Sequence, residues 1–527
     1  MSDEPDRNSP PPVARFRDFI GFDPIECRSK PLENKAERAT SSISFFFYLR
    51  PSDSLLYSPP MKRRVLALAV LALSIFPAIC HAQSTLSFAR AMQPADFRTT
   101  GFAVVNPAAT SATVSFSLYG AGGSPEQVST LTIPARGQAA KLASELFTST
   151  RASGWVQATS DTTGLQGFWF AGDFSTFADG AEAAPSSNEL VLPLIAPQSE
   201  IDIANTGNAD VTLMLHLLGE DGGDLWTAYP KRIPPKGFFK ADVATLFVGI
   251  DDFSASRHMR IECGCPDASY AAAIIARDFI AGPSWAVANA VPASQNTFVA
   301  NFPHFVEGPQ GSANWRSVLG ITNLSKTSAN DVTITFMSET GTPLRSPVER
   351  TLPPNGGLRA FVRDFGVPPG FQNGWIRVMS TSGLPLTGFV TYADTAAGGV
   401  AVVPPQLDAE MALLFSHIAD LAPWFTGLAL LNTNKSAANV GVFALNPSGT
   451  LIGKSEFALQ PGTKTAKLLS ELIPQTQNRA SDGGFLFIQS DLPLFGIELF
   501  FSRNLQILSN VAAGRVLPGI TFVLPAQ

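Results

Sequence analysis

Hydrophobic and polar residues alternate with a period of two along several short segments of the chain. The clearest runs lie at 112–118, 211–217, 332–337 and 440–445. Alternation of this kind is typical of a β-strand with one face buried and the other in water. Glycine-rich sequences at 120–123 and 220–223 follow two of these runs and predict hairpin tips. The pattern therefore predicts an all-β protein.

Each alternating run is preceded by a short strand-like sequence that ends in asparagine. These residues are Asn106, Asn205, Asn323 and Asn432, and their spacings are 99, 118 and 109 residues. Asparagine at the end of a strand is favourable turn chemistry, because its side chain bonds nearby backbone groups. The regular recurrence predicts four copies of one unit.

The remainder of each unit also recurs. A strand stops at a proline and glycine turn at 133–137, 233–237, 352–356 and 459–462, where proline cannot donate to a ladder. A short helical segment follows, and 140–146 matches 466–472 at six of seven positions. Two final strands are predicted from 154, 258, 374 and 484, and from 167, 272, 388 and 496.

One more strand precedes each unit, and a fifth instance at 520–525 ends the chain. We assign repeat 1 to 84–187, repeat 2 to 188–296, repeat 3 to 297–407 and repeat 4 to 408–527. Six or seven short strands in about 110 residues favour four tandem Ig-like β-sandwiches, each with a short helical segment. The alternative is a closed, four-bladed, propeller-like ring, which the fifth strand favours.

The third copy carries a recognisable pattern. It reads Phe-x-His-Phe at 302–305, Trp-Arg-x4-Ile-x-Asn at 315–323, Leu-Pro-Pro-x-Gly at 352–356 and Gly-Trp-Ile-x-Val at 374–378. This pattern resembles tandem repeats in uncharacterised secreted proteins of environmental Gram-negative bacteria, over nearly all of 84–527. The resemblance implies an array of Ig-like β-domains and implies no activity or site residue.

The N-terminal region contains an export signal. Met61 begins a basic stretch, an apolar run covers 65–79, and Ala82 supplies a small residue for cleavage. We therefore expect a Sec-type signal peptide at 61–82 and a secreted or periplasmic protein, with 1–60 a mis-called, disordered upstream extension. The rival interpretation is a cytoplasmic tail followed by an uncleaved signal anchor.

Charge excludes some partners. The chain carries a formal charge of −6, and because 1–82 holds 11 Lys+Arg and 9 Asp+Glu, the remainder carries −8. An acidic body with 15% charged residues argues against binding to nucleic acid and to anionic lipid. We expect no membrane insertion after the signal is cleaved, and no cofactor.

The residue types that usually carry chemistry do not form a catalytic motif. Cys263 and Cys265 could form a strained pair in an oxidising compartment, and no cysteine or histidine spacing predicts zinc. His304 and His417 share a position that holds Arg90 and Leu194 in the other copies, so we interpret them as polar residues at strand ends. We assign no catalytic, cofactor-binding or metal-binding residue.

Other repeated positions have structural interpretations. Asp173, Asp278, Asp394 and Ser502 recur near the last predicted strand and are expected to cap a turn. Trp155, Met259, Trp375 and Phe485 are taken as equivalent core anchors. The loop at 175–179 is a candidate contact surface.

These features predict a non-enzymatic structural, adhesive or binding scaffold that engages protein or glycan through loops. The alternative, from a different class, is a carbohydrate-active or other hydrolytic enzyme with paired carboxylates at a junction between repeats. A stalk that only spaces other domains is a third possibility.

Overall fold

The structure is a computed structural model that describes residues 83–148, 152–230, 232–250, 253, 256–265, 267–280, 284–477 and 483–516. Contacts divide the chain into one unit of Met1–Phe22 with Gln83–Gln527 and another of Asp23–Ala82. All described residues belong to the first unit. The predicted extension, the signal peptide and the strand at 520–525 lie outside them. No helix in the described part is long and apolar enough to cross a bilayer.

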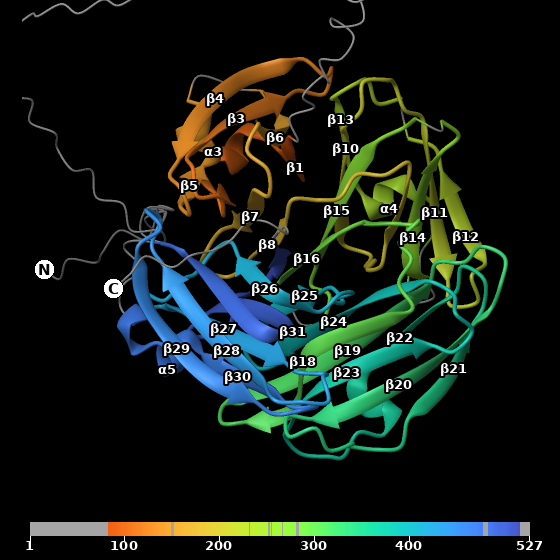
Figure 1. Cartoon of the computed structure of the whole chain (residues 1–527). Coiled ribbons are helices and arrows are strands. Elements are labelled where there is room, and N and C mark those ends of the chain that lie inside the picture. Colours follow the sequence, from red (N-terminus) through yellow and green to blue (C-terminus); the bar gives the residue numbers. More distant parts are fainter. Residues whose placement is uncertain are drawn as a thin grey trace, which may run out of the picture. The chain divides into compact units, whose positions relative to one another are not determined.

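The described chain consists mainly of antiparallel strands, which confirms the all-β prediction (Figure 1). Each repeat contributes two groups of four paired strands, and in repeats 2 and 4 a two-residue strand, β17 (Val291–Pro292) or β33 (Gly514–Arg515), is added to one group. We call the group that contains the long hairpin the hairpin sheet, and the other the joint sheet, because it contacts the preceding repeat. A short helical turn follows the first strand of each joint sheet: α3 (Ala143–Leu146), α4 (Val243–Leu246), η2 (Val362–Phe365) and α5 (Leu469–Leu472).

Repeats 1 and 2 have separate sheets. In repeat 1 the hairpin sheet has the order β1 (Ser84–Met92), β6 (Gly154–Ser160), β3 (Ala112–Tyr119), β4 (Pro125–Ile133), and the joint sheet has the order β5 (Gln138–Leu142), β2 (Thr100–Val105), β7 (Gln166–Gly172), β8 (Ala178–Glu182). In repeat 2 the hairpin sheet has the order β12 (Asp224–Ala228), β11 (Leu213–Gly219), β14 (Ser256–Cys263), β9 (Glu189–Leu192), β17 (Val291–Pro292). The joint sheet of repeat 2 has the order β13 (Phe238–Asp242), β10 (Ser199–Asn205), β15 (Tyr270–Arg277), β16 (Trp285–Asn289).

Repeats 3 and 4 keep the same order but join their two sheets through shared strands. In repeat 3 the hairpin sheet has the order β21 (Val348–Leu352), β20 (Asn330–Ser338), β23 (Gln372–Ser380), β18 (Val299–Gln310). The joint sheet of repeat 3 has the order β22 (Gly357–Phe361), β19 (Ala313–Asn323), β24 (Leu386–Asp394), β25 (Val400–Val403). Repeat 4 has β29 (Leu451–Leu459), β28 (Ala438–Leu445), β31 (Phe485–Ser502), β26 (Glu410–Phe415), β33 (Gly514–Arg515), and β30 (Lys464–Leu468), β27 (Trp424–Leu431), the second half of β31, β32 (Leu508–Ala512). The 3-10 turns η1 (Pro94–Arg98) and η3 (Pro474–Thr476) complete the elements.

Each repeat thus has eight principal strands rather than the predicted six or seven. The strands that the sequence did not reveal are β8, β16, β25 and β32, which follow the last predicted strand of each repeat, and β5, β13, β22 and β30, whose residues were assigned to the predicted helical segment. That segment is helical only over the four residues that follow each of these latter strands. The strands of the first group are four or five residues long, and β8, β25 and β32 are mostly buried on both faces. A strand of this kind shows no alternation, so the period-two signal is lost.

The four recurrent asparagines fasten each repeat internally. All four are fully buried. The side-chain nitrogen of Asn323 donates to the carbonyls of Ser328 (2.9 Å), Leu352 (3.3 Å) and Pro353 (2.8 Å), while its oxygen accepts the Ser325 amide. Asn106 and Asn205 bond three equivalent carbonyls, and Asn432 bonds two. Each asparagine side chain therefore links the loop that follows its own strand to the end of a second strand.

Successive repeats meet at four joints, which we name joint 1–2, joint 2–3, joint 3–4 and joint 4–1. At each joint the hairpin tip of one repeat touches the proline and glycine turn of the next. Backbone hydrogen bonds join Gly357 to Glu220 (3.1 Å) at joint 2–3, Lys464 to Glu339 (2.9 Å) at joint 3–4, and Gln138 to Pro447 (2.9 Å) at joint 4–1. At joint 1–2 a Cβ added to Gly123 would lie 1.8 Å from the Pro235 oxygen.

The hydrophobic clusters follow the same cyclic order. The core of repeat 1 includes Ile275 and Val287 of repeat 2. The core of repeat 2 includes Val318 and Phe389 of repeat 3, the core of repeat 3 includes residues of repeat 4, and the core of repeat 4 includes residues of repeat 1. Strand β8 also contacts β16, which contacts β25 (Figure 1). Strand β32 contacts both β25 and β8 and so completes the cycle. Two paired sheets per repeat and a closed cycle of repeats therefore coexist.

Candidate functional site

The cysteine pair shows no sign of a site. Cys263 ends β14, Cys265 follows two residues later, and both are free thiols. A hydrogen bond with Cys263 raises the pKa of the Cys265 thiol, which makes it less reactive. Within the described ranges, no group of three or more His, Cys, Asp or Glu side chains could hold a metal ion.

The recurrent acids act as turn caps, as predicted. The Asp173 carboxylate accepts the amides of Ser175, Thr176 and Phe177 at 2.8–3.0 Å. Asp278 accepts the Ser284 amide, and Asp394 accepts the Ala396 amide. Because each accepts amides of the turn that leads to the last strand, these residues shape the turn.

The prediction for the aromatic anchors was wrong in two respects. Strand register aligns His258, and not Met259, with Trp155, Trp375 and Phe485. These residues lie at joints rather than in the sandwich cores. The Trp155 indole nitrogen donates to the Lys236 carbonyl of the next repeat (2.7 Å). Trp375 packs on Leu431 and Phe495 of repeat 4, and Phe485 packs on Val105 of repeat 1.

Two further interpretations hold only in part. His417 follows the end of β26, as predicted, but His304 lies inside β18 at a register shift, and burial at the joints lowers the pKa of both, that of His417 to about 4. In the loop at 175–179, Ser175 and Thr176 are exposed, but the rest of the loop is covered. Phe177 stacks on Trp285 of repeat 2 at a centroid distance of 4.8 Å, and Asp179 is buried.

Joint 1–2 is filled by charged side chains. Arg90 is buried and pairs with Glu200, Asp202 (3.2 Å) and Asp96 (3.3 Å). Lys240 adds a bond to Glu200 of 2.6 Å. Burial acts to lower the pKa of Arg90, but the three carboxylates raise it overall. Burial also raises the pKa of Asp202 to about 6, despite the attraction of Arg90 and Lys240.

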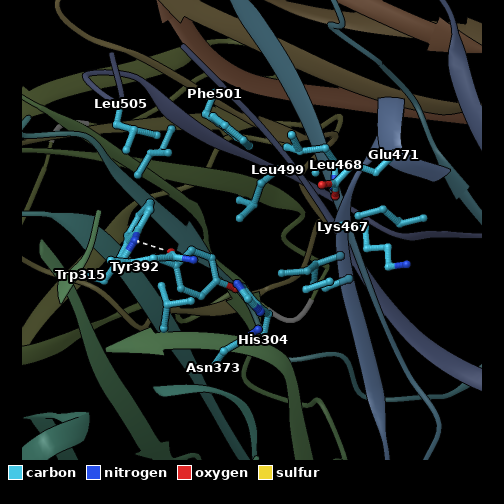
Figure 2. Close-up of a pocket in the computed structure, with 18 of the residues that line it drawn as sticks. His304, Trp315, Asn373, Tyr392, Lys467, Leu468, Glu471, Leu499, Phe501 and Leu505 are labelled. Carbon is cyan, nitrogen blue, oxygen red and sulfur yellow. Dashed lines mark hydrogen bonds between the residues drawn. The ribbon is translucent and has the colours of Figure 1, made fainter. Parts of the chain in front are cut away.

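Joint 3–4 contains a pocket of about 280 Å³, which is the candidate functional site. Repeat 3 supplies His304, Trp315, Phe371 and Tyr392, and repeat 4 supplies aliphatic side chains and Phe501. Figure 2 shows Trp315, Tyr392 and His304 along one side, with Lys467 and Glu471 across from them. The His304 and Tyr392 rings meet edge to face at 5.2 Å.

Small residues of the joint sheet create this pocket. Gly427 and Ala429 precede Asn432 by the same spacings as Glu200 and Asp202 precede Asn205. Ala466 pairs with Ala429 as Lys240 pairs with Asp202. The three small residues therefore occupy the positions of Glu200, Asp202 and Lys240 in joint 1–2. All three small residues line the pocket. Where joint 1–2 places long side chains, joint 3–4 therefore leaves space.

The equivalent positions in joint 4–1 are also small, but aromatic side chains occupy the space there. Phe168 and Phe170 of repeat 1 pack on Phe500, with ring centroids 6.1 and 4.7 Å away. In repeat 4 the positions equivalent to Phe168 and Phe170 are occupied by Ile497 and Leu499. Small joint-sheet residues thus leave a pocket where aliphatic residues replace these two phenylalanines.

A buried lysine lies behind the pocket. The Lys464 side chain is 3% exposed, and its Nζ contacts His304 Nδ1 and Asn373 Oδ1. Burial lowers the pKa of Lys464 to about 7, although Glu339 opposes this shift. Burial and the nearby Lys464 charge lower the pKa of His304 well below its usual value. The neutral imidazole of His304 can therefore accept a hydrogen bond from Lys464 Nζ.

The polar groups around the pocket are largely bonded to one another. The Asn373 amide nitrogen donates to Glu339 (3.1 Å), the Trp315 indole donates to Gln310 (3.2 Å), and the Glu471 carboxylate accepts the Leu468 amide (3.0 Å). The Tyr392 hydroxyl is buried without a hydrogen-bond partner. The walls thus offer aromatic and aliphatic surface with one free hydroxyl, which suits an apolar or aromatic group.

Sequence reasoning did not find this pocket. Trp315 belongs to the repeat pattern at 315–323 but has no predicted role there, and no sequence pattern indicated Lys464 or Tyr392. The available signal was the loss of large residues at Gly427, Ala429 and Ala466, which only an alignment among the four repeats could show.

Comparisons with known proteins do not identify a relative. No known protein family and no curated protein matches the chain. Among solved structures, a protein described as Thermotoga maritima 1070 is similar to 21% of this chain, over 95% of its own length, with 18% sequence identity and a TM-score of 0.18. A likeness at that score carries no argument about fold or function.

Proposed function

We propose that the chain is a secreted, non-enzymatic scaffold of four tandem Ig-like β-sandwiches that binds an apolar or aromatic group of a protein or glycan partner in the pocket at joint 3–4. The carrying observation is the pocket itself. Its polar groups are mostly bonded internally, while aromatic faces line an unfilled hollow of about 280 Å³.

The two groups of antiparallel strands in each repeat support the β-sandwich part of this assignment. The basic, apolar and small-residue sequence at 61–82 supports export from the cytoplasm. N-terminal sequencing of the mature protein tests export, with a first residue at or near Gln83 expected. A mature chain that still begins near Met1 would contradict it.

The hydrolase alternative needs two carboxylates that face one substrate. Glu471 is the single carboxylate among the residues that line the joint 3–4 pocket, and it accepts the Leu468 amide. Glu200 and Asp202 do lie together at joint 1–2, but Arg90 and Lys240 neutralise them. The arrangement therefore favours binding over hydrolysis.

Titration with N-phenyl-1-naphthylamine, an uncharged aromatic fluorophore, tests the binding site. Trp315→Ala removes an aromatic wall, and we expect affinity to fall by about tenfold or more, because burying a large aromatic contributes roughly 1.5–3 kcal/mol. Trp226→Ala is the matched control, since Trp226 lies on β12 and is 44% exposed.

A second variant fills the pocket rather than enlarging it. Ala466→Leu places a larger side chain at a lining position, and we expect it to block the fluorophore while the protein remains folded. Ala458→Leu, at an exposed position of β29, controls for added apolar surface. Unchanged affinity in both Trp315→Ala and Ala466→Leu would show that the fluorophore binds elsewhere and would overturn the proposal.

A further inference from the structure

A second cavity, of about 190 Å³, lies where the last strands of the repeats meet. All four repeats line it, through Glu182 of β8, Asn289 of β16, Val402 of β25 and Asn510 of β32. It shares no lining residue with the pocket at joint 3–4. The cavity is therefore a separate candidate site.

Two residues that line this cavity carry buried amide oxygens that lack hydrogen-bond donors. The Asn289 side-chain nitrogen donates to the Glu182 carbonyl (2.9 Å), which fixes the amide so that its oxygen is the unpartnered atom. Asn510 is only 4% exposed, and its side-chain oxygen is buried and also unpartnered. A buried acceptor without a donor is costly, so both atoms favour a ligand that donates hydrogen bonds.

Glu182 gives the cavity a negative charge. One of its carboxylate oxygens accepts the Ala512 amide of β32. No lysine, arginine or histidine is among the lining residues, and Glu182 is the one acid. Burial raises the pKa of this carboxyl. A cation that enters the cavity would supply the missing countercharge.

The remaining walls are apolar. Val287, Ala290, Phe389 and Val402 line the cavity beside the three oxygen-bearing side chains. Calcium takes six to eight oxygen ligands and magnesium keeps several waters, so aliphatic walls suit neither ion. A primary ammonium carries three N–H donors, as a lysine side chain does, and its alkyl chain can pack on aliphatic surface.

We propose that the cavity binds a small primary alkylammonium ion, which donates hydrogen bonds to the Glu182 carboxylate, Asn289 Oδ1 and Asn510 Oδ1 and packs its alkyl chain on Val287 and Val402. Pro185 at the rim is exposed, and Glu182 is itself partly exposed, so the cavity reaches solvent. This proposal does not depend on the function of the pocket at joint 3–4.

Isothermal titration of the full chain with n-butylammonium tests the proposal. Tetramethylammonium carries the same charge but no N–H donor, and potassium has neither donor nor alkyl chain. We expect saturable binding of n-butylammonium with one site per chain, and at least about tenfold weaker binding of the other two cations, because neither can donate hydrogen bonds to the three oxygens. Absence of n-butylammonium binding, or equal binding of all three cations, would overturn the proposal.

Glu182→Gln removes the charge and keeps an oxygen for the Ala512 amide, so we expect a folded protein with affinity lowered at least about tenfold. Glu126→Gln, on an exposed position of β4, should bind as the unmodified chain does. Asn510→Leu tests the second acceptor independently if Glu182→Gln fails to fold. Affinity that is insensitive to both substitutions, or a crystal soaked in n-butylammonium with only water in the cavity, would contradict the assignment.

Discussion

Joint 1–2 and joint 3–4 use equivalent positions of the same repeat in opposite ways. Arg90 and His304 both lie two residues beyond an equivalent phenylalanine, inside a register shift of the strand pairing. Arg90 meets Glu200 and Asp202 of the next repeat, whereas His304 faces a pocket lined by Gly427 and Ala429. The backbone contact between repeats is retained, and the side chains differ.

This difference shows how one repeat can form joints with separate roles. Buried charges need their own partners, because an unpaired buried charge is costly. The network at joint 1–2 therefore disfavours pairing of repeat 1 with any joint sheet that lacks the two carboxylates. Joint 3–4 lacks this constraint and is incompletely filled, so it can accept a ligand. We therefore propose that the charged joint fixes the order of the repeats and that the open joint provides a binding surface.

Breaking the charged joint should have the largest effect. Arg90→Met leaves Glu200 and Asp202 buried, with Lys240 and Arg277 as the remaining close cations. We expect a loss of about 3–5 kcal/mol in the free energy of unfolding, as for removal of one partner of a buried ion pair. Urea denaturation measures it. Adding Glu200→Gln and Asp202→Asn should restore much of the loss, and a triple variant as unstable as Arg90→Met would contradict the electrostatic explanation.

A substitution inside a repeat provides a reference that does not depend on the joints. Asn323→Ala removes donors to three carbonyls and an acceptor for one amide. We expect a loss of about 2–3 kcal/mol, because buried backbone groups are left unpaired. Asn432 bonds two carbonyls and accepts the backbone and side-chain amides of Asn434, so Asn432→Ala leaves one fewer backbone group unpaired and should cost less. An equal or larger cost for Asn432→Ala would show that these bonds do not set the difference.

Joint 3–4 should give a pH dependence that joint 1–2 does not share. The pKa of Lys464 is about 7 in the folded chain, against 10.5 ordinarily. Between these values the unfolded chain binds more protons than the folded chain, so stability rises with pH. From pH 7 to about pH 9 the contribution is up to about 2–3 kcal/mol.

Lys464→Met removes that slope, and urea midpoints at the two pH values measure it. The comparison concerns the slope alone, because the substitution also removes the contacts with His304 and Asn373. An identical slope in Lys464→Met and the unmodified chain would show that Lys464 titrates normally.

The sequence predicted the local features of this fold better than its long-range contacts. Period-two alternation and the asparagine, proline and glycine turns predicted most strands and hairpins, because these signals lie within a few residues. Strands β8, β25 and β32 were missed since they are short and buried on both faces, and β5, β13, β22 and β30 were assigned to the helical segment that follows them. The His258 position was misaligned with Met259 because repeat 2 has no tryptophan there.

The candidate site was less accessible from sequence. Its walls come from segments more than 150 residues apart, such as Trp315 and Phe501, and nothing local indicates that they meet. The pocket also depends on an absence of large side chains at Gly427, Ala429 and Ala466. A small residue in a strand has many causes, so its meaning became clear only beside Glu200 and Asp202 of joint 1–2.

The most direct test of the cyclic arrangement is a pair of spin labels across joint 4–1, measured by pulsed electron paramagnetic resonance. Cysteines at Ala135 and Ser448, with Cys263 and Cys265 replaced by serine, carry the labels, and a pair at Ala121 and Pro235 across joint 1–2 provides the comparison. Residues 136 and 449 lie close enough that a Cβ on Gly449 would sit 2.4 Å from the Arg136 oxygen. A closed cycle predicts similar short distances for both pairs. A short distance at joint 1–2 with a long, broad distribution between repeats 1 and 4 would contradict closure.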